Sequence, residues 1–488
     1  MSALWKIPLI AVLLLLLAGC GGGGEPTGPD EEPEPASGGT AVIGVISDMD
    51  SWNEYLAKQT SSLKVLRRIY LPLARESWAG GDGPTLEPRL AESWDVSGDG
   101  RTVTFTLRDM SWSDGTPVTA DDVRFTWTAQ ISEEVAWSSA DVKSAIRDVR
   151  VAGPRTAVFE LNRTYPEMMA DIITGGILPR HVFGQVPFDR WQTYDWSSAR
   201  VGSGPYLLHR HRPGEEVSLA RNPSFYRSDL PHLDRIVYRI VPDLGNLILQ
   251  LQAGTVDLVE GIAPWQADSL MTSSSLDIRE MPSLGYDYIG WNATRAPLDD
   301  PEIRKALTMA IDREGIVEEL LYGHGSVRPG PIPRAYRVAV EGEAWPYDPE
   351  RAKKILEGKG FQAMGETLHR NGEPFEIEMT TNAGNELRNM VMVRVQEQLA
   401  RIGVQVRLLP PMQMGAFVSK NLSGDFDAYV GGWAFEGKVE LRSLFASDAV
   451  PPGGFNVVRY RSTRFDEALL AMEAAPTIGE MAEALQQI

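Results

Sequence analysis

Strand-like and helix-like segments alternate along nearly the whole chain after Thr40. Residues 40–46 form an apolar run typical of a buried strand, and residues 102–107 alternate apolar and polar side chains as a half-buried strand does. Residues 61–73 instead repeat apolar side chains at helical spacing. This interleaving favours an α/β fold over an all-α or all-β fold. At 488 residues the chain is too long for one ordinary core, so we expect two or three lobes.

The single cysteine, Cys20, lies before this pattern begins. Residues 7–18 are apolar apart from one proline, and they fall short of the roughly 20 residues that span a bilayer. Small residues then precede Cys20, which is similar to a bacterial lipobox. We therefore expect a lipoprotein signal peptide over 1–19 and a lipid-modified Cys20. An ordinary cleaved signal, or a short uncleaved anchor, with an incidental cysteine is the alternative.

Residues 20–39 are rich in glycine, proline and acidic side chains and cannot bury enough apolar surface to fold. They predict a solvated tether that holds the folded part beside a membrane, outside the cytoplasm. With Cys20 in the lipidation site, the folded part contains no thiol and no disulfide.

The charge balance argues against nucleic acid as a partner. The formal net charge is −19, whereas a protein that binds a phosphate backbone needs a basic face. The chain also contains 13 Trp and 14 Tyr, enough for large cores and for pockets lined by aromatic side chains.

Residues 107–127 carry the densest local signal. Thr119 is a natural helix N-cap, and Asp121 and Asp122 follow in the first turn, where carboxylates face the positive end of the helix dipole. With Asp114, these residues could be taken for a metal or acid–base cluster. Capping explains them without any chemistry, so we expect no catalytic role.

Residues 90–123, "LAESWDVSGDGRTVTFTLRDMSWSDGTPVTADDV", resemble the signature segment of bacterial extracellular solute-binding protein family 5. That family includes the peptide-, nickel- and oligosaccharide-binding components of ABC importers. Further matches follow in the order the family shows, and they span nearly everything after Thr40: "GSGPY" at 202–206, "ARNPSFY" at 220–226, "LQAGTVDLVEGI" at 251–262, "YDPERAKKIL" at 347–356 and "VQEQLARIGVQV" at 395–406.

The resemblance implies a two-lobed α/β fold of the class II periplasmic-binding-protein type, with an extra small domain on the first lobe. A small solute would bind between the lobes, which close about a hinge, and a monomer would deliver it to permease subunits in the membrane. The implied division is 40–73 and 202–281 for lobe I, 74–201 for the small domain, 282–475 for lobe II, and 476–488 for the start of a C-terminal helix that returns to lobe I, in a chain we expect to be truncated.

Peptide-binding relatives pair the peptide ammonium with an aspartate that follows a tryptophan in the second lobe. Here Trp433 matches the tryptophan, Phe435 stands in place of the aspartate, and Glu436 is one residue away, on the other face of an extended segment. An ammonium buried without a counter-charge is costly, so a neutral ligand such as an oligosaccharide is the alternative to a peptide. Further candidate ligand residues, each also an ordinary loop or core residue, are Asp50, Ser51, Trp52, Asn53, Trp291, Asn382 and Asn385.

No catalytic constellation stands out in the sequence. We find no nucleophile elbow, zinc helix motif, phosphate loop or dinucleotide fingerprint, and we expect no cofactor. His209 and His211 could face one side of a strand, but two ligands do not close a metal site. A secreted lipoprotein hydrolase, a binder of metal chelates, and a sensor or folding helper for secreted chains remain as alternatives to the importer component.

Overall fold

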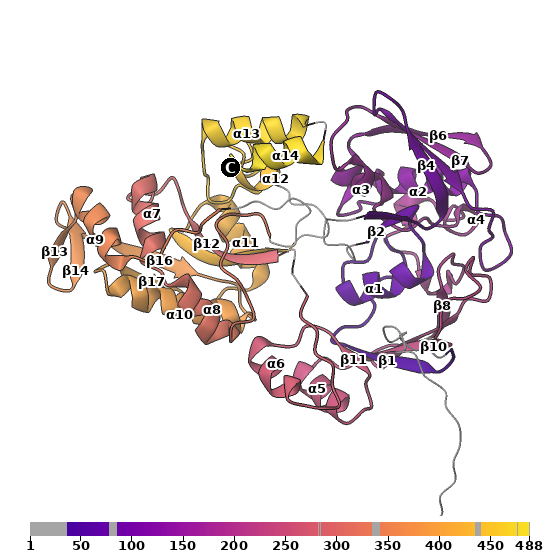
Figure 1. The fold of residues 1–488 in the computed structure, drawn as a ribbon, viewed down its shortest axis with the longest axis horizontal. Coiled ribbons are helices and arrows are strands. Elements are labelled where there is room, and N and C mark those ends of the chain that lie inside the picture. Colours follow the sequence, from indigo (N-terminus) through magenta and orange to yellow (C-terminus); the bar gives the residue numbers. More distant parts are fainter. Residues whose placement is uncertain are drawn as a thin grey trace, which may run out of the picture.

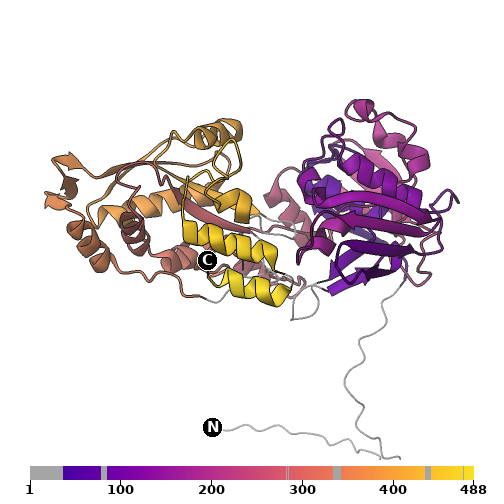
Figure 2. The ribbon, with the colours of Figure 1, turned by 90° about the horizontal axis from the view of Figure 1, so that it is seen from above.

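The computed structural model describes residues 37–77, 85–281, 283, 285–333, 342–434, 441–475 and 477–487. Two bodies lie side by side along the long axis, the first built from the N-terminal half and the second from the C-terminal half (Figures 1 and 2). Within the described ranges, no helix is both long enough and apolar enough to cross a membrane.

The first body, called lobe I here, contains a five-stranded sheet in the order β11-β1-β10-β9-β8. The apolar run expected to be a strand forms β1, which pairs in parallel with β10 and β11, while β10, β9 and β8 are antiparallel neighbours. The strands are β1 Thr40–Val45, β8 Tyr206–Arg212, β9 Glu216–Arg221, β10 Arg235–Ile240 and β11 Leu258–Val259.

A four-stranded antiparallel sheet, β4-β5-β7-β6, and a hairpin of β2 and β3 also belong to lobe I. Burial alternates along β5, as the sequence predicts. The elements are β2 Ala74–Ser77, β3 Thr85–Pro88, β4 Ala91–Val96, β5 Thr102–Leu107, β6 Ile146–Gly153, β7 Thr156–Leu161, α1 Thr60–Ile69, α2 Ala120–Gln130, α3 Met168–Ile173 and α4 Arg180–Phe183, with short 3-10 helices at Ala140–Lys143, Phe188–Arg190 and Trp196–Ser198.

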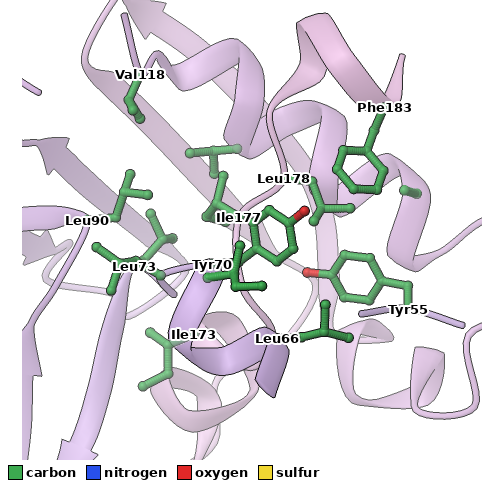
Figure 3. Packing of buried hydrophobic residues seen from close by; sticks show 14 of the residues in the cluster. Tyr55, Leu66, Tyr70, Leu73, Leu90, Val118, Ile173, Ile177, Leu178 and Phe183 are labelled. Carbon is green, nitrogen blue, oxygen red and sulfur yellow. The ribbon is translucent and has the colours of Figure 1, made fainter. Parts of the chain in front are cut away.

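One continuous apolar core unites the two sheets of lobe I. Figure 3 shows Leu66 of α1 and Tyr70, its C-cap, among apolar side chains that include Leu73, Ile177 and Phe183. Both residues are almost fully buried. Because α1 packs between the sheets, the segment after β1 is held rigidly and its loop has a defined shape.

The second body, called lobe II here, is built on a four-stranded sheet in the order β12-β18-β16-β17. β12 runs antiparallel to β18, and β16 is parallel to both of its neighbours. Helices α7, α9 and α10 cover one face of the sheet, and α11 packs on the other face. The elements are β12 Gly285–Trp291, β16 Glu376–Thr380, β17 Gln405–Leu408, β18 Ala428–Ala434, α7 Pro301–Met309, α8 Arg313–Leu321, α9 Pro349–Gly358, α10 Glu386–Ala400 and α11 Met414–Ser423.

Three helices near the end of the chain form a small apolar cluster of their own, together with Ile332. In both ribbon views they lie at the end of lobe II nearest lobe I (Figures 1 and 2). They are α12 Leu441–Phe445, α13 Thr463–Ala474 and α14 Ile478–Leu485. A peripheral sheet comprises β13 Gln362–Met364, β14 Thr367–Arg370 and β15 Glu373–Pro374.

Helices α5 and α6 extend from the lobe I sheet toward lobe II. α5, Leu244–Gln252, packs against β11, and α6, Pro264–Met271, contacts α8 of lobe II. The segment that follows α6 leads into β12. The two lobes therefore touch beside a place where the chain crosses from one to the other.

Candidate functional site

A cavity of about 970 Å³ lies in lobe II. It is enclosed by β12, the terminal strand of the lobe II sheet, by α8, by the first turns of α10 and by the loop 323–333. This volume is large enough for a ligand of several hundred daltons. The apolar and aromatic part of its lining is Tyr286, Tyr288, Ile289, Trp291, Ile311, Ile316, Val317, Leu321, Leu387, Val391, Val430 and Phe445.

A buried tyrosine pair lies at one wall of this cavity, and Tyr288 is the member of the pair that lines it. The hydroxyls of Tyr288 on β12 and Tyr429 on β18 are 2.7 Å apart and share a hydrogen bond. Burial raises the pKa of Tyr288, although hydrogen bonds to Tyr429 and Trp433 partly offset this effect. Burial also raises the pKa of Tyr429. Both phenols therefore stay neutral at physiological pH, and the wall contributes aromatic surface without charge.

An ion pair crosses from α10 to β12 at the rim of the cavity. The Arg388 Nε donates to Asp287 Oδ1 at 2.8 Å, and Arg388 Nη1 donates to Asn382 Oδ1 at 2.7 Å. Asn385, the N-cap of α10, accepts a hydrogen bond from the Arg388 backbone N–H. A Cβ at Gly432 on β18 would overlap both the Arg388 guanidinium and the Asp287 carboxylate, so glycine at this position leaves room for the pair.

Four of the predicted ligand residues thus lie in or near one region of lobe II. Trp291 lines the cavity, and Asn382 and Asn385 hold Arg388 in place. Trp433 follows Gly432 on β18, is half-buried and meets the exposed Phe455 edge-on, with ring centroids 6.3 Å apart. The other two predicted residues in this lobe, Phe435 and Glu436, lie outside the described residues. Cys20 does so as well.

Of the four candidates in lobe I, Asp50, Ser51 and Asn53 form hydrogen bonds with their own loop and the start of α1. The Asp50 carboxylate accepts from the backbone N–H groups of Lys58 and Gln59 and from the Ser62 hydroxyl, at 2.6–3.1 Å. The Ser51 hydroxyl accepts from the Asn53 backbone N–H, and the Asn53 side chain accepts from the backbone N–H of Tyr55. Asn53 is fully buried, yet its side-chain nitrogen has no hydrogen-bond partner among the described residues. Ligand binding by these four residues stays a prediction.

Trp52 is buried against a histidine of β8. Its ring meets His211 edge-on, with centroids 5.3 Å apart, and His211 Nε2 is 2.9 Å from Asp48 Oδ1. Burial would raise the pKa of Asp48, but hydrogen bonds from the Gly214 and Met49 backbones and from His211 hold it below the usual value. His211 therefore orders the loop after β1. Among the described residues, no three His, Cys, Asp or Glu side chains gather as metal ligands would.

The aspartates of the segment 107–127 act as the sequence predicts. Thr119 and Asp122 form a reciprocal capping box at the start of α2. The second oxygen of Asp122 accepts a hydrogen bond from the Arg180 backbone N–H at 2.8 Å. Asp121 pairs with Arg124 on the surface. These carboxylates are thus engaged in helix capping and surface pairing.

Three arginines of this region were not identified from the sequence. Arg388 lies at the cavity rim, and Arg313 and Arg328 line the cavity itself. Each is an unremarkable charged residue in its local pattern. The only local hint is the absence of an acidic residue near Arg328 in the proline- and glycine-rich run "SVRPGPIP".

Comparison with known proteins agrees with this architecture. Residues 85–440 match the model of bacterial extracellular solute-binding proteins, family 5. The chain belongs to this family. The oligopeptide-binding protein AppA of Bacillus subtilis is 26% identical over 96% of this chain and 87% of its own length, and the glutathione-binding protein GsiB of Salmonella typhimurium is 27% identical over 88% and 82%.

Solved structures show the same arrangement. AppA in complex with a nonapeptide superposes with a TM-score of 0.73 at 25% identity, covering 93% of this chain and 91% of that one. The ABC transporter substrate-binding protein CtaP of Listeria monocytogenes gives a TM-score of 0.79 at 25% identity, covering 93% and 90%. The expected two-lobed α/β fold is confirmed, and so is the expected function, that of a substrate-binding protein of an ABC importer.

Proposed function

We propose that this family 5 protein captures a peptide or a comparable small organic solute in the lobe II cavity and that lobe I then closes over it. The observation that carries this proposal is the cavity of about 970 Å³, bounded by aromatic side chains and lying in the lobe that follows the crossing segment. Two relatives, an oligopeptide-binding protein and a glutathione-binding protein, support a peptide-like solute. Phe435 stands where peptide-binding relatives have an aspartate, so oligosaccharides and metal chelates are also tested as solutes.

The proposed division of labour follows the expected domains. Residues 282–475 would supply most of the solute contacts, and residues 40–73 and 202–281 would act as the closing lobe, with 74–201 attached to it. Closure removes water from the solute and strengthens its polar contacts. A solute shifts the open–closed balance only through its tighter binding to the closed form.

The role would be binding without chemistry. Asp122 caps a helix and Asp287 forms an ion pair. The relatives AppA and GsiB are binding proteins. We further infer that Cys20 is acylated, so that the folded part works on the outer side of a membrane as a monomer beside its permease. Two acyl chains suffice for stable anchoring.

A thermal-shift screen of the purified protein tests the ligand class. Peptides, oligosaccharides and metal chelates would be added in turn, because a ligand that binds only the folded state raises the melting temperature. A true solute should also reduce the radius of gyration in small-angle scattering, since the lobes close on it. A parallel turnover assay for each stabilising compound should show no product. Steady consumption of a compound, with no change in the radius of gyration of the protein, would contradict the proposal.

A matched pair of variants places the solute in the cavity. Val317→Trp fills the cavity from α8, whereas Val393→Trp adds the same bulk on an exposed part of α10 that does not line it. Only the first should weaken the shift caused by the identified solute. An equal loss in both variants would place the binding site elsewhere.

A further inference from the structure

The charged side chains of the lobe II cavity are not balanced. Its lining contains two carboxylates, two arginines and one histidine: Glu280, Asp287, Arg313, Arg328 and His324. The two carboxylates already have partners, since Asp287 pairs with Arg388 and Glu280 Oε1 lies 2.5 Å from His324 Nδ1. Both carboxylates of the lining are therefore paired with other side chains of the protein. The two arginines of the lining are not accounted for by these pairs.

Arg328 has an incomplete set of partners. One terminal nitrogen donates to the Ile332 carbonyl at 3.4 Å, a long contact, and Nε is buried without a partner among the described residues. A guanidinium presents five N–H donors in a planar fork, and a buried donor without an acceptor costs free energy. Among the described residues, most of this fork is without an acceptor.

Arg313 is a second cation without an ion pair in the described part of the chain. It is half-buried at the start of α8, and its guanidinium donates to the backbone carbonyl of Trp345. Burial lowers the pKa of Arg313, while the neighbouring Glu314 contributes only a weaker opposing attraction. A negative charge brought close to Arg313 would offset this cost of burial.

The two arginines of the cavity stand out against the negative net charge of the protein. The chain carries a net charge of −19, yet two arginines that line the lobe II cavity form no ion pair with any described residue. Carboxylates match the arginine fork with two parallel hydrogen bonds. The remaining walls are aromatic or aliphatic, as on Tyr286, Trp291 and Ile316.

We propose that the solute is an anion with an apolar body, and that its carboxylate binds Arg328 with Arg313 as a second positive group. The apolar body would lie on the aromatic and aliphatic walls. The described lining offers no uncommitted carboxylate for an ammonium, so a free amino group on the solute should add nothing. This inference rests on the proposed solute-binding function and names the class of solute.

Calorimetric titration tests the inference with four probes. They are an N-acetylated apolar tripeptide, the same peptide with a C-terminal amide, the tripeptide with a free amino group, and an aryl-alkyl carboxylic acid without peptide bonds. We expect both carboxylate peptides to bind alike and at least about tenfold more tightly than the amide. Binding of the aryl-alkyl acid would show that the carboxylate alone selects the solute; its failure would restrict the class to peptides.

Variants assign the preference to the arginines. Arg328→Gln should bring the carboxylate and amide peptides within about twofold, Arg328→Lys should keep part of the difference, and Arg401→Gln, on the exposed end of α10, should change nothing. If Arg328→Gln does not fold, Arg313→Gln and the salt dependence of carboxylate binding to the wild type test the same point, because added salt should weaken an ionic contact.

The outcomes separate the inference from the function on which it rests. Equal binding of the carboxylate and the amide, or an Arg328→Gln variant that keeps the full preference, overturns the inference and leaves solute binding intact. Binding of neutral sugars alone has the same consequence. A cooperatively folded protein that binds no probe, charged or neutral, counts against both.

Discussion

Arg388 on α10 is ion-paired with Asp287 on β12, with Nε 2.8 Å from Oδ1, and the pair lies where a side chain at Gly432 would otherwise stand. Arg388 thereby ties a covering helix to the terminal strand of the sheet, beside the cavity. Its contacts to Asn382 and to the N-cap of α10 fix the rim of the proposed solute site.

We expect Arg388→Met to lower the free energy of unfolding by about 2 kcal/mol, because it leaves Asp287 and the Asn382 carbonyl without their donor. Chemical denaturation followed by tryptophan fluorescence measures the change. Arg394→Met is the matched control, since Arg394 lies on the same helix and pairs with more exposed glutamates, Glu319 and Glu397. Exposed pairs contribute little, so the control should cost less than about 1 kcal/mol. Equal losses would contradict the structural role given to Arg388.

Local features of the fold could be predicted from the sequence, whereas contacts between distant residues, including those of the lobe II site, could not. Asp122 and Thr119 are three residues apart, and their capping box needs only the helix that contains them. The start of α7 is a similar case, because its N-cap Asp300 and the first helical residue Pro301 are adjacent in the sequence. The α/β alternation likewise depends on short-range periodicity.

Trp52 shows why contacts between distant residues could not be predicted from the sequence. Trp52 follows β1 in the sequence, but its ring is buried against His211 of β8, a contact that only the fold creates. Ligand contact by Trp52 stays a prediction. Arg388 is the converse case. It is an ordinary helix residue in "NELRNMV", and its importance comes from Asp287 and Gly432, which only the fold brings to it.

The proposed lipid anchor leads to a prediction about location. Cys20→Ala should abolish fatty-acid labelling and release the protein from the membrane fraction, because one thiol is the acceptor and a tether of glycine and proline has no membrane affinity of its own. Metabolic labelling with an alkyne fatty acid and fractionation of a bacterial host provide the measurement. Ser37→Ala, in the same tether, should remain labelled and membrane-bound. An acylated Cys20→Ala variant would rule the site out.

Lys143 is a buried amine of lobe I, and burial lowers its pKa to about 7. Its ammonium donates to the backbone carbonyls of Asp171, Ile172 and Thr174 at 2.5–3.0 Å, around the C-terminal end of α3. Lys143→Met would remove the side-chain donor of the Asp171 and Ile172 carbonyls, while the Thr174 carbonyl would keep its hydrogen bond from Gln130, and the change should cost on the order of 3 kcal/mol of stability. Thermal unfolding measures the loss, and the exposed Lys58→Met serves as control. An unchanged melting temperature for Lys143→Met would show that the carbonyls find other donors.

His324 should make the contact between the lobes depend on pH. It follows α8, and its Nε2 lies 3.1 Å from Asp268 Oδ1 on α6, while Nδ1 lies 2.5 Å from Glu280 Oε1 in the segment that leads into β12. Hydrogen bonds to Asp268 and then Glu280 raise the pKa of His324. Only the protonated ring donates from both nitrogens, so loss of the proton removes one of the two contacts.

The sign of the effect follows from the raised pKa. The stabilisation by His324 is complete below about pH 6.5, the value expected in the unfolded chain, and it is lost as the pH rises through the higher folded-state pKa. The melting temperature of His324→Gln should therefore fall furthest below that of the wild type at about pH 5.5, and the gap should narrow by about pH 8.5. His209→Gln, an exposed histidine on β8, should show no such trend. A gap for His324→Gln that stays constant with pH, or widens as the pH rises, would mean that the histidine does not carry the charge assigned to it.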